Sequence, residues 1–237
     1  RQQDIRHNSY RYVLGVEGEL SNGWAYDVSY SNSETAVAST YMNDLSITRI
    51  KRALDVILDA DGNPACRSAV NGTDPNCVPW NVFINNGNQI VDDPVDGVTQ
   101  AALDYLIVDL YARGEVYEEI WQAVLSGQID ALNGANVVVG IEQRTTGMDN
   151  RPDIGFLTGD GAGQGGPTKA LGGEYDVDEV FFEMGIPVND QLSVDLGARM
   201  SDYSTGQDTD TWKVGAKYVV NDKVTVRATT QYAVRHG

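Results

Sequence analysis

The sequence predicts an all-β protein: an antiparallel meander of about eight strands with long loops at one end. Three observations support this prediction. Apolar and polar side chains alternate in several separate segments, tight-turn sequences join those segments, and two long polar inserts interrupt them. Because successive side chains of an extended chain point to opposite faces, this alternation predicts strands with one apolar face and one polar face.

The first predicted hairpin covers residues 10–31. One face carries Tyr10, Tyr12, Leu14, Val16 and Leu20 before the turn, and Trp24, Tyr26, Val28 and Tyr30 after it. The opposite face carries charged side chains. The connecting segment Ser21-Asn22-Gly23 favours a tight turn, because glycine adopts the backbone angles that such turns need.

The last third of the chain repeats this pattern in residues 192–201, 212–220 and 224–232. Asn189-Asp190 and Asn221-Asp222 predict short turns, whereas residues 204–210 predict a longer connection at the other end of the sheet. In the middle of the chain, residues 116–127, 137–144 and 175–188 are predicted strands, with a turn near Asn133-Gly134.

Two inserts separate these strands, residues 32–113 and 145–173, and we expect both to be long loops on the extracellular side. The first insert predicts a short helix near residues 99–110. Residues 50–58 fit either a helical turn or the end of a strand. The second insert is rich in Gly and Asp.

Composition limits the possible functions. The net charge of -17 argues against nucleic-acid binding, which requires a basic surface. No stretch of about 18 apolar residues predicts a transmembrane helix, and no signal peptide is visible, so we expect an internal start, either processed or cut from a longer protein. Cys66 and Cys77 flank a polar turn and predict a local disulfide in an oxidising compartment, with two free thiols as the alternative.

Long loops at one end and tight turns at the other are typical of bacterial outer-membrane barrels. Lipid cannot pair with backbone polar groups, so a membrane-spanning sheet has to close, with an apolar outer face and a polar inner face. Tyr10, Trp24, Trp212 and Tyr232 lie near strand ends on the apolar face, where aromatic side chains form interfacial girdles. The alternative is a soluble β-sandwich, which also alternates. Many charges on the polar face and the length of the two inserts disfavour it.

Several stretches resemble TonB-dependent receptors. Residues 173–183, GEYDVDEVFFE, followed by Ile186-Pro187-Val188, resemble the family's strand G-x-Y-x-V-x-E-x-F-x-E-x-x-I-P-L. Residues 192–204 resemble the next strand with its ending R-x-S-D-Y-S, and Trp212-Lys213-Val214-Gly215 resembles a W-K-x-G strand start. Residues 59–68 with 77–81 resemble an extracellular loop of the carbohydrate- and siderophore-associated branch. The resemblance covers most of the chain, and the order of these motifs is specific. Where the family's last matching strand continues to R-A-P, this sequence instead reads His236-Gly237.

The resemblance implies an outer-membrane protein of a bacterium that takes up a scarce nutrient, such as a siderophore or a carbohydrate. It also implies a 22-stranded barrel with an N-terminal plug and energy supplied through TonB. This chain has neither the plug nor a TonB box, so we expect a middle-to-late barrel segment, which either is part of a larger barrel or closes into a smaller one. Expected partners are membrane lipid, a small nutrient ligand and, through the plug, TonB. No cofactor and no nucleic acid are expected.

Candidate site residues lie on the predicted polar faces. The charged side chains that could line a ligand path are Glu17, Glu19, Asp27, Glu142, Arg144, Asp195, Arg199, Lys213, Lys217 and Arg227. Their alternative role is to neutralise one another inside a water-filled barrel.

Catalysis is the weaker alternative. Glu179 and Glu183 share a predicted face and are the candidates for a glycosidase carboxylate pair, but they lie roughly 13 Å apart along an extended strand. A soluble, receptor-derived binding module or hydrolase is therefore the second hypothesis for the function. No metal site is expected, because the histidines lie at the chain ends and Asp59-x-Asp61-x-Asn63 lacks the Gly and Glu of a calcium loop.

Overall fold

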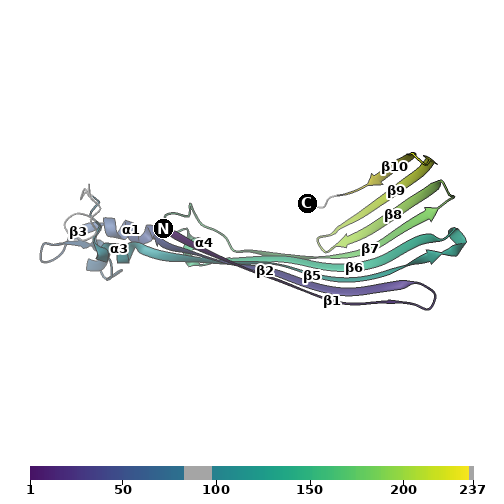
Figure 1. Cartoon of the computed structure of the whole chain (residues 1–237). Coiled ribbons are helices and arrows are strands. Elements are labelled where there is room, and N and C mark those ends of the chain that lie inside the picture. The colour runs from purple at the N-terminus through teal and green to yellow at the C-terminus, as the bar shows by residue number, and fades with distance from the viewer. Residues whose placement is uncertain (83–97, 235–237) are drawn as a thin grey trace. The chain divides into compact units, whose positions relative to one another are not determined.

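The computed structural model describes residues 1–82 and 98–234, and its main element is one eight-stranded sheet (Figure 1). The strands are β1 (Gln2–Glu19), β2 (Ala25–Leu45), β5 (Ile107–Ile129), β6 (Ala135–Pro152), β7 (Leu171–Pro187), β8 (Leu192–Tyr203), β9 (Gln207–Asn221) and β10 (Val224–Tyr232). Their order in the sheet is their order in the chain, so the sheet is a meander, as predicted. Within the described residues the sheet is open, with β1 and β10 at its edges.

The chain divides into two compact units. The sheet unit consists of residues 9–35, 115–148 and 172–237. The loop unit consists of residues 1–8, 36–114 and 149–171, and it contains α1 (Ile47–Leu54), β3 (Val56–Leu58), β4 (Pro64–Cys66), α2 (Arg67–Val70), α3 (Gln100–Leu106) and α4 (Ile154–Thr158). None of the described helices combines the length and hydrophobicity that crossing a membrane requires.

Asparagine side chains close the short turns of the sheet unit. The side-chain oxygen of Asn189 accepts hydrogen bonds from the backbone N–H of Gln191 and Leu192, both at 2.9 Å, and Asn221 does the same for Lys223 and Val224. Between β5 and β6, the 3₁₀ turn η1 (Asp130–Leu132) ends at Asn133, which adopts a left-handed conformation with φ of 55°. Asparagine tolerates both roles better than most residues do.

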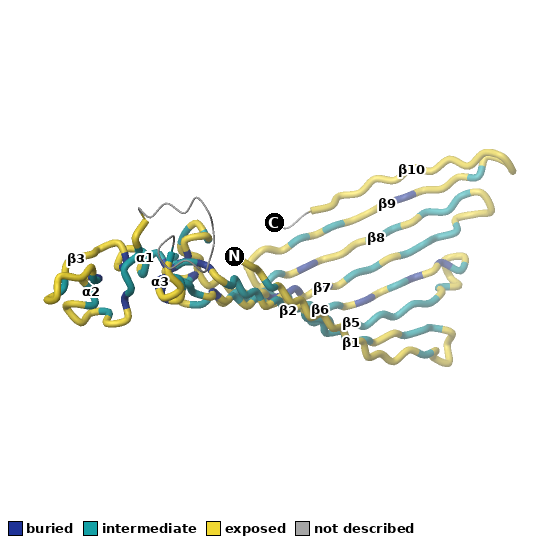
Figure 2. Tube along the Cα trace, turned by 60° about the vertical axis from the view of Figure 1, so that its left-hand side comes forward, coloured by how far each residue is buried: buried dark blue, intermediate teal, exposed yellow. Residues whose placement is uncertain are grey.

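The register of β7 to β10 separates the two faces of the sheet. Leu196 lies opposite Val214, and Trp212 lies opposite both Ala198 and Tyr232. Val194, Ala216 and Ala228 continue this apolar face. Figure 2 shows that most residues of these strands are exposed or only partly covered. The apolar face of the sheet unit is therefore uncovered within the described residues.

Three glycines of the sheet unit make room for aromatic rings on neighbouring strands. The ring of Trp24 lies over Gly127, that of Phe181 over Gly140 and that of Tyr117 over Gly147. A Cβ atom built at any of these glycines would come within 2.4 Å of the ring. Because a shift by one residue would place a side chain under each ring, these pairs help to fix the register.

The loop unit has a conventional buried core. Ala53, Tyr105 and Leu106 pack with the disulfide between Cys66 and Cys77, and Leu45, Ile50, Ala69, Val78 and Trp80 surround this cluster. The disulfide confirms the prediction made from the two cysteines. The hydroxyls of Ser46 and Thr99 accept from backbone N–H groups of the first turns of α1 and α3 and so begin these helices.

The strands are longer than the sequence predicts. The strands β2, β5, β6 and β7 occupy the ends of both expected inserts, so the connections shrink to residues 46–106 and 153–170. Part of the first insert, residues 83–97, lies outside the described residues, as do residues 235–237. The connection expected at 204–210 is only a three-residue turn at 204–206. Residues 50–58 form both alternatives, the end of α1 and all of β3, and the helix expected at 99–110 is α3.

Candidate functional site

The polar face of the sheet unit is the candidate functional site. Residues that share this face in β7 to β10 are Glu179, Phe181 and Glu183 on β7; Asp195, Arg199 and Ser201 on β8; Lys213 and Lys217 on β9; and Arg227 on β10. The strict alternation of each strand, combined with the antiparallel register, brings together residues that are far apart in the sequence.

Glu179 forms a buried polar contact on this face. Its carboxylate accepts a hydrogen bond of 3.0 Å from Nη1 of Arg199 and one of 2.6 Å from the hydroxyl of Ser201. Glu179 is buried, and the guanidinium of Arg199 also lies over the ring of Phe181, 5.1 Å from its centroid. The arrangement satisfies a buried carboxylate with a charge and a hydroxyl, as burial requires. The ion pair with Glu179 on β7 therefore holds the side chain of Arg199 against the neighbouring strand.

Glu183, two positions beyond Phe181 on the same face, is not brought into contact with Glu179. Its Cγ atom lies over Gly197 of the neighbouring strand, 3.9 Å from the position that a Cβ atom would take there. A hollow of about 420 Å³ is lined by Glu183 and by residues that include Asp195, Arg199 and Lys213. Both proposed catalytic glutamates border a hollow, Glu179 one of about 720 Å³ and Glu183 the one of about 420 Å³, but they differ in that Glu179 is ion-paired with Arg199.

The part of the face on β5 and β6 carries Gln122, Glu142 and Arg144. The side-chain amide of Gln122 donates to Glu142 at 3.0 Å. The Nε atom of Arg144 is buried and has no hydrogen-bond partner within the described residues. A buried N–H without a partner is unfavourable, and Arg144 is the predicted ligand-path residue in which the described residues leave such an atom unsatisfied.

The two edges of this face carry charges of opposite sign. Glu17, Glu19 and Asp27 border a hollow of about 410 Å³ on β1 and β2. Lys213, Lys217 and Arg227 lie on β9 and β10, where Lys217 and Arg227 are directly opposite each other. The acidic residues of β1 and β2 and the basic residues of β9 and β10 therefore lie near opposite edges of the sheet, whereas Glu142, Arg144, Asp195 and Arg199 between them carry both charges.

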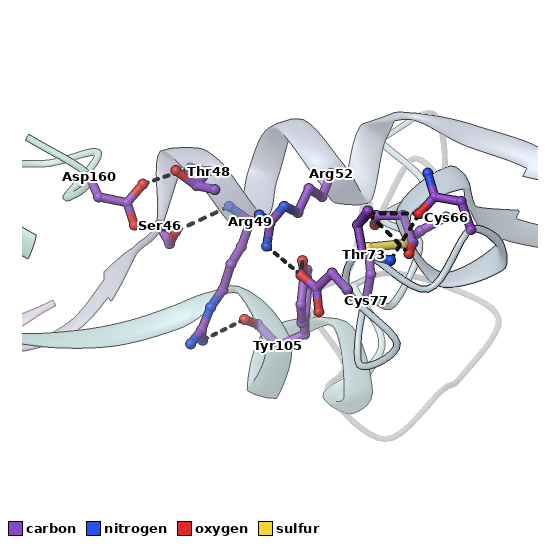
Figure 3. Close-up of polar contacts among 12 residues, drawn as sticks. Ser46, Thr48, Arg49, Arg52, Cys66, Thr73, Cys77, Tyr105 and Asp160 are labelled. Carbon is purple, nitrogen blue, oxygen red and sulfur yellow. Dashed lines mark hydrogen bonds and ion pairs between the residues drawn. A yellow bond between two sulfur atoms is a disulfide. The ribbon is translucent and has the colours of Figure 1, made fainter. Parts of the chain in front are cut away.

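The loop unit contains a second polar cluster, shown in Figure 3. The carboxylate of Asp74 accepts from Nη1 of Arg52 at 2.7 Å and from the hydroxyl of Tyr105 at 2.8 Å. These two contacts, with that of Tyr105 the larger, hold the pKa of Asp74 below its ordinary value. Burial and the neighbouring carboxylate raise the pKa of Tyr105. This cluster lines a hollow of about 620 Å³ together with Arg49 and Asp104.

Asp160, on the connection after α4, joins that connection to α1. Its carboxylate accepts from the hydroxyl of Ser46 at 2.5 Å and from the backbone N–H of Thr48 at 2.8 Å. Burial raises the pKa of Asp160, but the hydrogen bonds from Ser46 and Thr48 outweigh it, and the pKa is lowered overall. A carboxylate at this position also compensates the positive end of the helix.

The Asp59 segment forms a turn that its own side chain closes. One carboxylate oxygen of Asp59 accepts from the backbone N–H groups of Asp61 and Asn63, at 2.9 and 2.8 Å. Within residues 1–82 and 98–234, no group of three or more His, Cys, Asp or Glu side chains is placed to hold a metal ion.

Sequence reasoning missed the partners of the charged residues. Ser201, Phe181 and Gln122 carry no charge, so a search for charged side chains on polar faces passed over them. Alternation could have found all three, because each shares a face with a predicted charged residue on the neighbouring strand.

Comparisons with known proteins agree with this architecture. Two solved structures of the ferric enterobactin receptor PfeA from Pseudomonas aeruginosa, the G324V mutant and the R480A/Q482A mutant, resemble the chain with TM-scores of 0.55 and 0.52 at 12% sequence identity. Each match covers 96% of this chain and 25% of the receptor chain, so the protein described here spans about a quarter of the length of these receptors. No curated protein matches the sequence. The family described as TonB dependent receptor-like, beta-barrel matches residues 1–235, and the chain therefore belongs to this family.

Proposed function

We propose that this chain forms part of the wall of an outer-membrane receptor that takes up a scarce nutrient, such as a siderophore or a carbohydrate, with energy supplied through TonB. In this proposal the apolar face of the sheet unit contacts membrane lipid and the polar face borders the ligand path. The loop unit, with residues 46–106 and 153–170, lies on the extracellular side. TonB acts through a plug domain that is not part of this sequence.

The observation that supports the proposal is the uncovered apolar face. Leu14, Val16 and Val226 are 70%, 65% and 53% exposed. Leaving such side chains in water forgoes roughly 1.5–3 kcal/mol for each one that could be fully buried. Hydrocarbon removes this cost, and a sheet with a polar opposite face is the arrangement that transmembrane barrels use.

The same observation weighs against the soluble binding module or hydrolase. That alternative requires Val194, Leu196 and Val214 to interdigitate with a second layer in a dry interior. The described residues contain no such layer over the sheet unit. Glu179, one of the two glutamates proposed for catalysis, is also engaged by Arg199 and Ser201.

Thiol labelling of two neighbouring positions tests the proposal. Val226→Cys places a thiol on the apolar face and Thr225→Cys places one on the polar face, while the native cysteines are paired. In outer membranes, we expect a water-soluble maleimide to label the Thr225→Cys variant and a lipid-soluble maleimide to be required for the Val226→Cys variant. Equal labelling of both variants by the water-soluble reagent, or recovery of the protein in the soluble fraction, would contradict the proposal.

A further inference from the structure

The apolar face of the sheet unit ends abruptly on the side away from the short turns. On each strand from β5 to β9, every second residue near the turn is apolar or glycine, and the run then stops within one step of two residues. The runs consist of the alternate residues within 121–129, 137–141, 180–186, 192–200 and 212–220. The first polar residues beyond them on the same face are Glu119, Gln143, Asp178, Asp202 and Asp210.

Three aspartates at this limit lie side by side on the apolar face. Asp202 is directly opposite Asp178 on one side and Asp208 on the other. All three are exposed, and within residues 1–82 and 98–234 none of them accepts a hydrogen bond or forms an ion pair. Asp178 and Asp202 lie on strands with described neighbours on both sides, so they are not at an edge of the sheet. Adjacent carboxylates without a compensating charge are too costly for hydrocarbon, so this level of the face borders water.

Side-chain contacts extend the register to β5 and β6. Thr145 on β6 donates to Asp176 on β7 at 2.6 Å, and the contact of an aromatic ring with a glycine between these strands fits the same antiparallel register. In that register Gln143 lies beside Asp178.

The contacts between β5 and β6 agree with one another in the same way. Gln128 donates to Asn136 at 3.1 Å, and the second contact of a ring with a glycine fits the same register. That register places Trp121 beside Gln143. One row across the sheet therefore consists of Trp121, Gln143, Asp178, Asp202 and Asp208.

The limit of the apolar face runs obliquely to this row. On β5 the apolar run includes the row, and its first polar residue, Glu119, is two residues farther from the turns. On β9 the run stops before the row, at Asp210, two residues nearer the turns. The limit thus shifts by about one residue per strand. With a rise of about 3.3 Å per residue and a strand spacing of about 4.8 Å, this shift corresponds to a strand tilt of roughly 35°, which is the tilt of transmembrane strands.

The short turns follow the same oblique direction. From the turn end of each strand to its first polar residue, the separation is 10 residues on β5, 8 on β6, 9 on β7, 10 on β8 and 11 on β9. The apolar face is therefore a strip of nearly constant width. About ten residues extend roughly 33 Å along a strand, and roughly 27 Å along the membrane normal at this tilt. Outer-membrane barrels carry an apolar band of about 25 Å.

We propose that the hydrocarbon of the membrane covers this strip and ends at an oblique line through Glu119, Gln143, Asp178, Asp202 and Asp210. The short turns lie at its other limit. Beyond the line, the outward side chains of β5 to β9 face lipid headgroups and water. The inference rests on the proposed function, and it adds where the membrane ends on the wall and how far the strands tilt.

Spin labels on single cysteines test the line, because oxygen enters hydrocarbon and a water-soluble nickel complex does not. The native cysteines are paired and do not react. The decisive pair is Trp121→Cys and Asp210→Cys in the intact protein in phospholipid vesicles. Along the register rows Trp121 lies farther from the turns than Asp210 does. The oblique line nevertheless predicts that the ratio of oxygen to nickel collisions is several times higher for the label at position 121.

A second pair lies on one strand and does not disturb an aromatic contact. Met200→Cys and Asp202→Cys are two residues apart on the same face, and the ratio should fall several-fold between them. Ala216→Cys is the reference for hydrocarbon, and Thr205→Cys, in the β8–β9 turn, is the reference for water.

The outcomes separate this inference from the proposed function. Equal ratios for Trp121→Cys and Asp210→Cys would overturn the oblique line, as would a ratio for Asp202→Cys that matches Ala216→Cys. In both cases the receptor function stands if the Val226 and Thr225 labelling pattern holds. A ratio for Ala216→Cys equal to that for Thr205→Cys would place the whole strip in water and refute both proposals.

Discussion

The two units of this protein treat their apolar side chains in opposite ways. The loop unit buries them in a small core around a disulfide, with Tyr105 and Leu106 almost inaccessible to solvent. The sheet unit is a single layer that leaves large apolar side chains exposed on one face. The comparison teaches that the loop unit has a buried core of its own, whereas the described residues of the sheet unit form a single layer that buries little apolar surface.

Placing a charge on the uncovered face is the strongest test of this contrast. In a bilayer, Val214→Arg should destabilise the protein by about 2–4 kcal/mol, the cost of an arginine on the lipid face of a barrel near the midplane. Thr229→Arg, on the polar face of the neighbouring strand, is the control and should change stability little. Reversible urea unfolding in lipid vesicles measures both. Equal effects of the two substitutions would show that the faces are not distinguished by lipid.

Removing the disulfide should affect the loop unit alone. Replacing Cys66 and Cys77 by Ser opens a loop with a sequence separation of 11 residues, which should cost about 3 kcal/mol through the greater freedom of the unfolded chain. We expect faster protease cleavage within residues 46–82 and unchanged resistance of β7 to β10. Cleavage in those strands at the same increased rate would mean that the two units unfold together.

Filling the space under an aromatic ring should affect the sheet unit alone. Gly140→Ala puts a Cβ atom 2.2 Å from the ring of Phe181, and such overpacking should cost about 1–3 kcal/mol. Gly173→Ala is the matched control, since nothing lies within 4 Å of its Cβ position. Adding Phe181→Leu to Gly140→Ala should recover part of the loss in the same urea unfolding. No recovery would assign the effect to the backbone instead of the ring.

The smallest expected effect is the acid sensitivity of the loop unit. Because the pKa of Asp74 is lowered in the folded protein, its contribution to stability is complete above the ordinary pKa of about 3.9 and is lost as the pH falls through the lowered value. Asp74→Asn should remove this dependence and speed thermolysin cleavage at neutral pH roughly threefold, a small effect because Arg52 is half-exposed. Pepsin digestion of both proteins at a series of acid pH values measures the acid dependence. An unaltered acid profile in Asp74→Asn would assign the sensitivity to another carboxyl group.

The strands of the sheet unit were predictable because one face is apolar and the other polar. The alternation of Leu192 to Met200 and of Trp212 to Val220 follows directly from that two-sided environment. The strand ends in residues 32–45 and 145–152 were missed. Both of their faces carry polar side chains, so the two-residue alternation of apolar and polar residues is not visible there. Asp208 and Asp210 similarly favoured a loop at 204–210, although both lie within β9.

The sequence predicts on which face of the sheet each candidate residue lies, but it does not predict which residues are in contact. Alternation correctly assigned Asp195, Arg199, Lys213 and Arg227 to one face, since each lies on the polar side of its strand. The register between strands decides which charges pair, and no single segment contains that information. The ion pair of Glu179 with Arg199 and the unpaired juxtaposition of Lys217 and Arg227 therefore emerged only from the structure.

The positions of the tryptophans give each unit its own optical signal. Trp80 borders the disulfide core of the loop unit, whereas Trp121 and Trp212 are about half exposed in the sheet unit. In membranes that contain brominated lipids, emission from Trp121 and Trp212 should dim while that of Trp80 persists. The protein thus carries an internal fluorescence reporter for the environment of each unit, and no dye has to be attached.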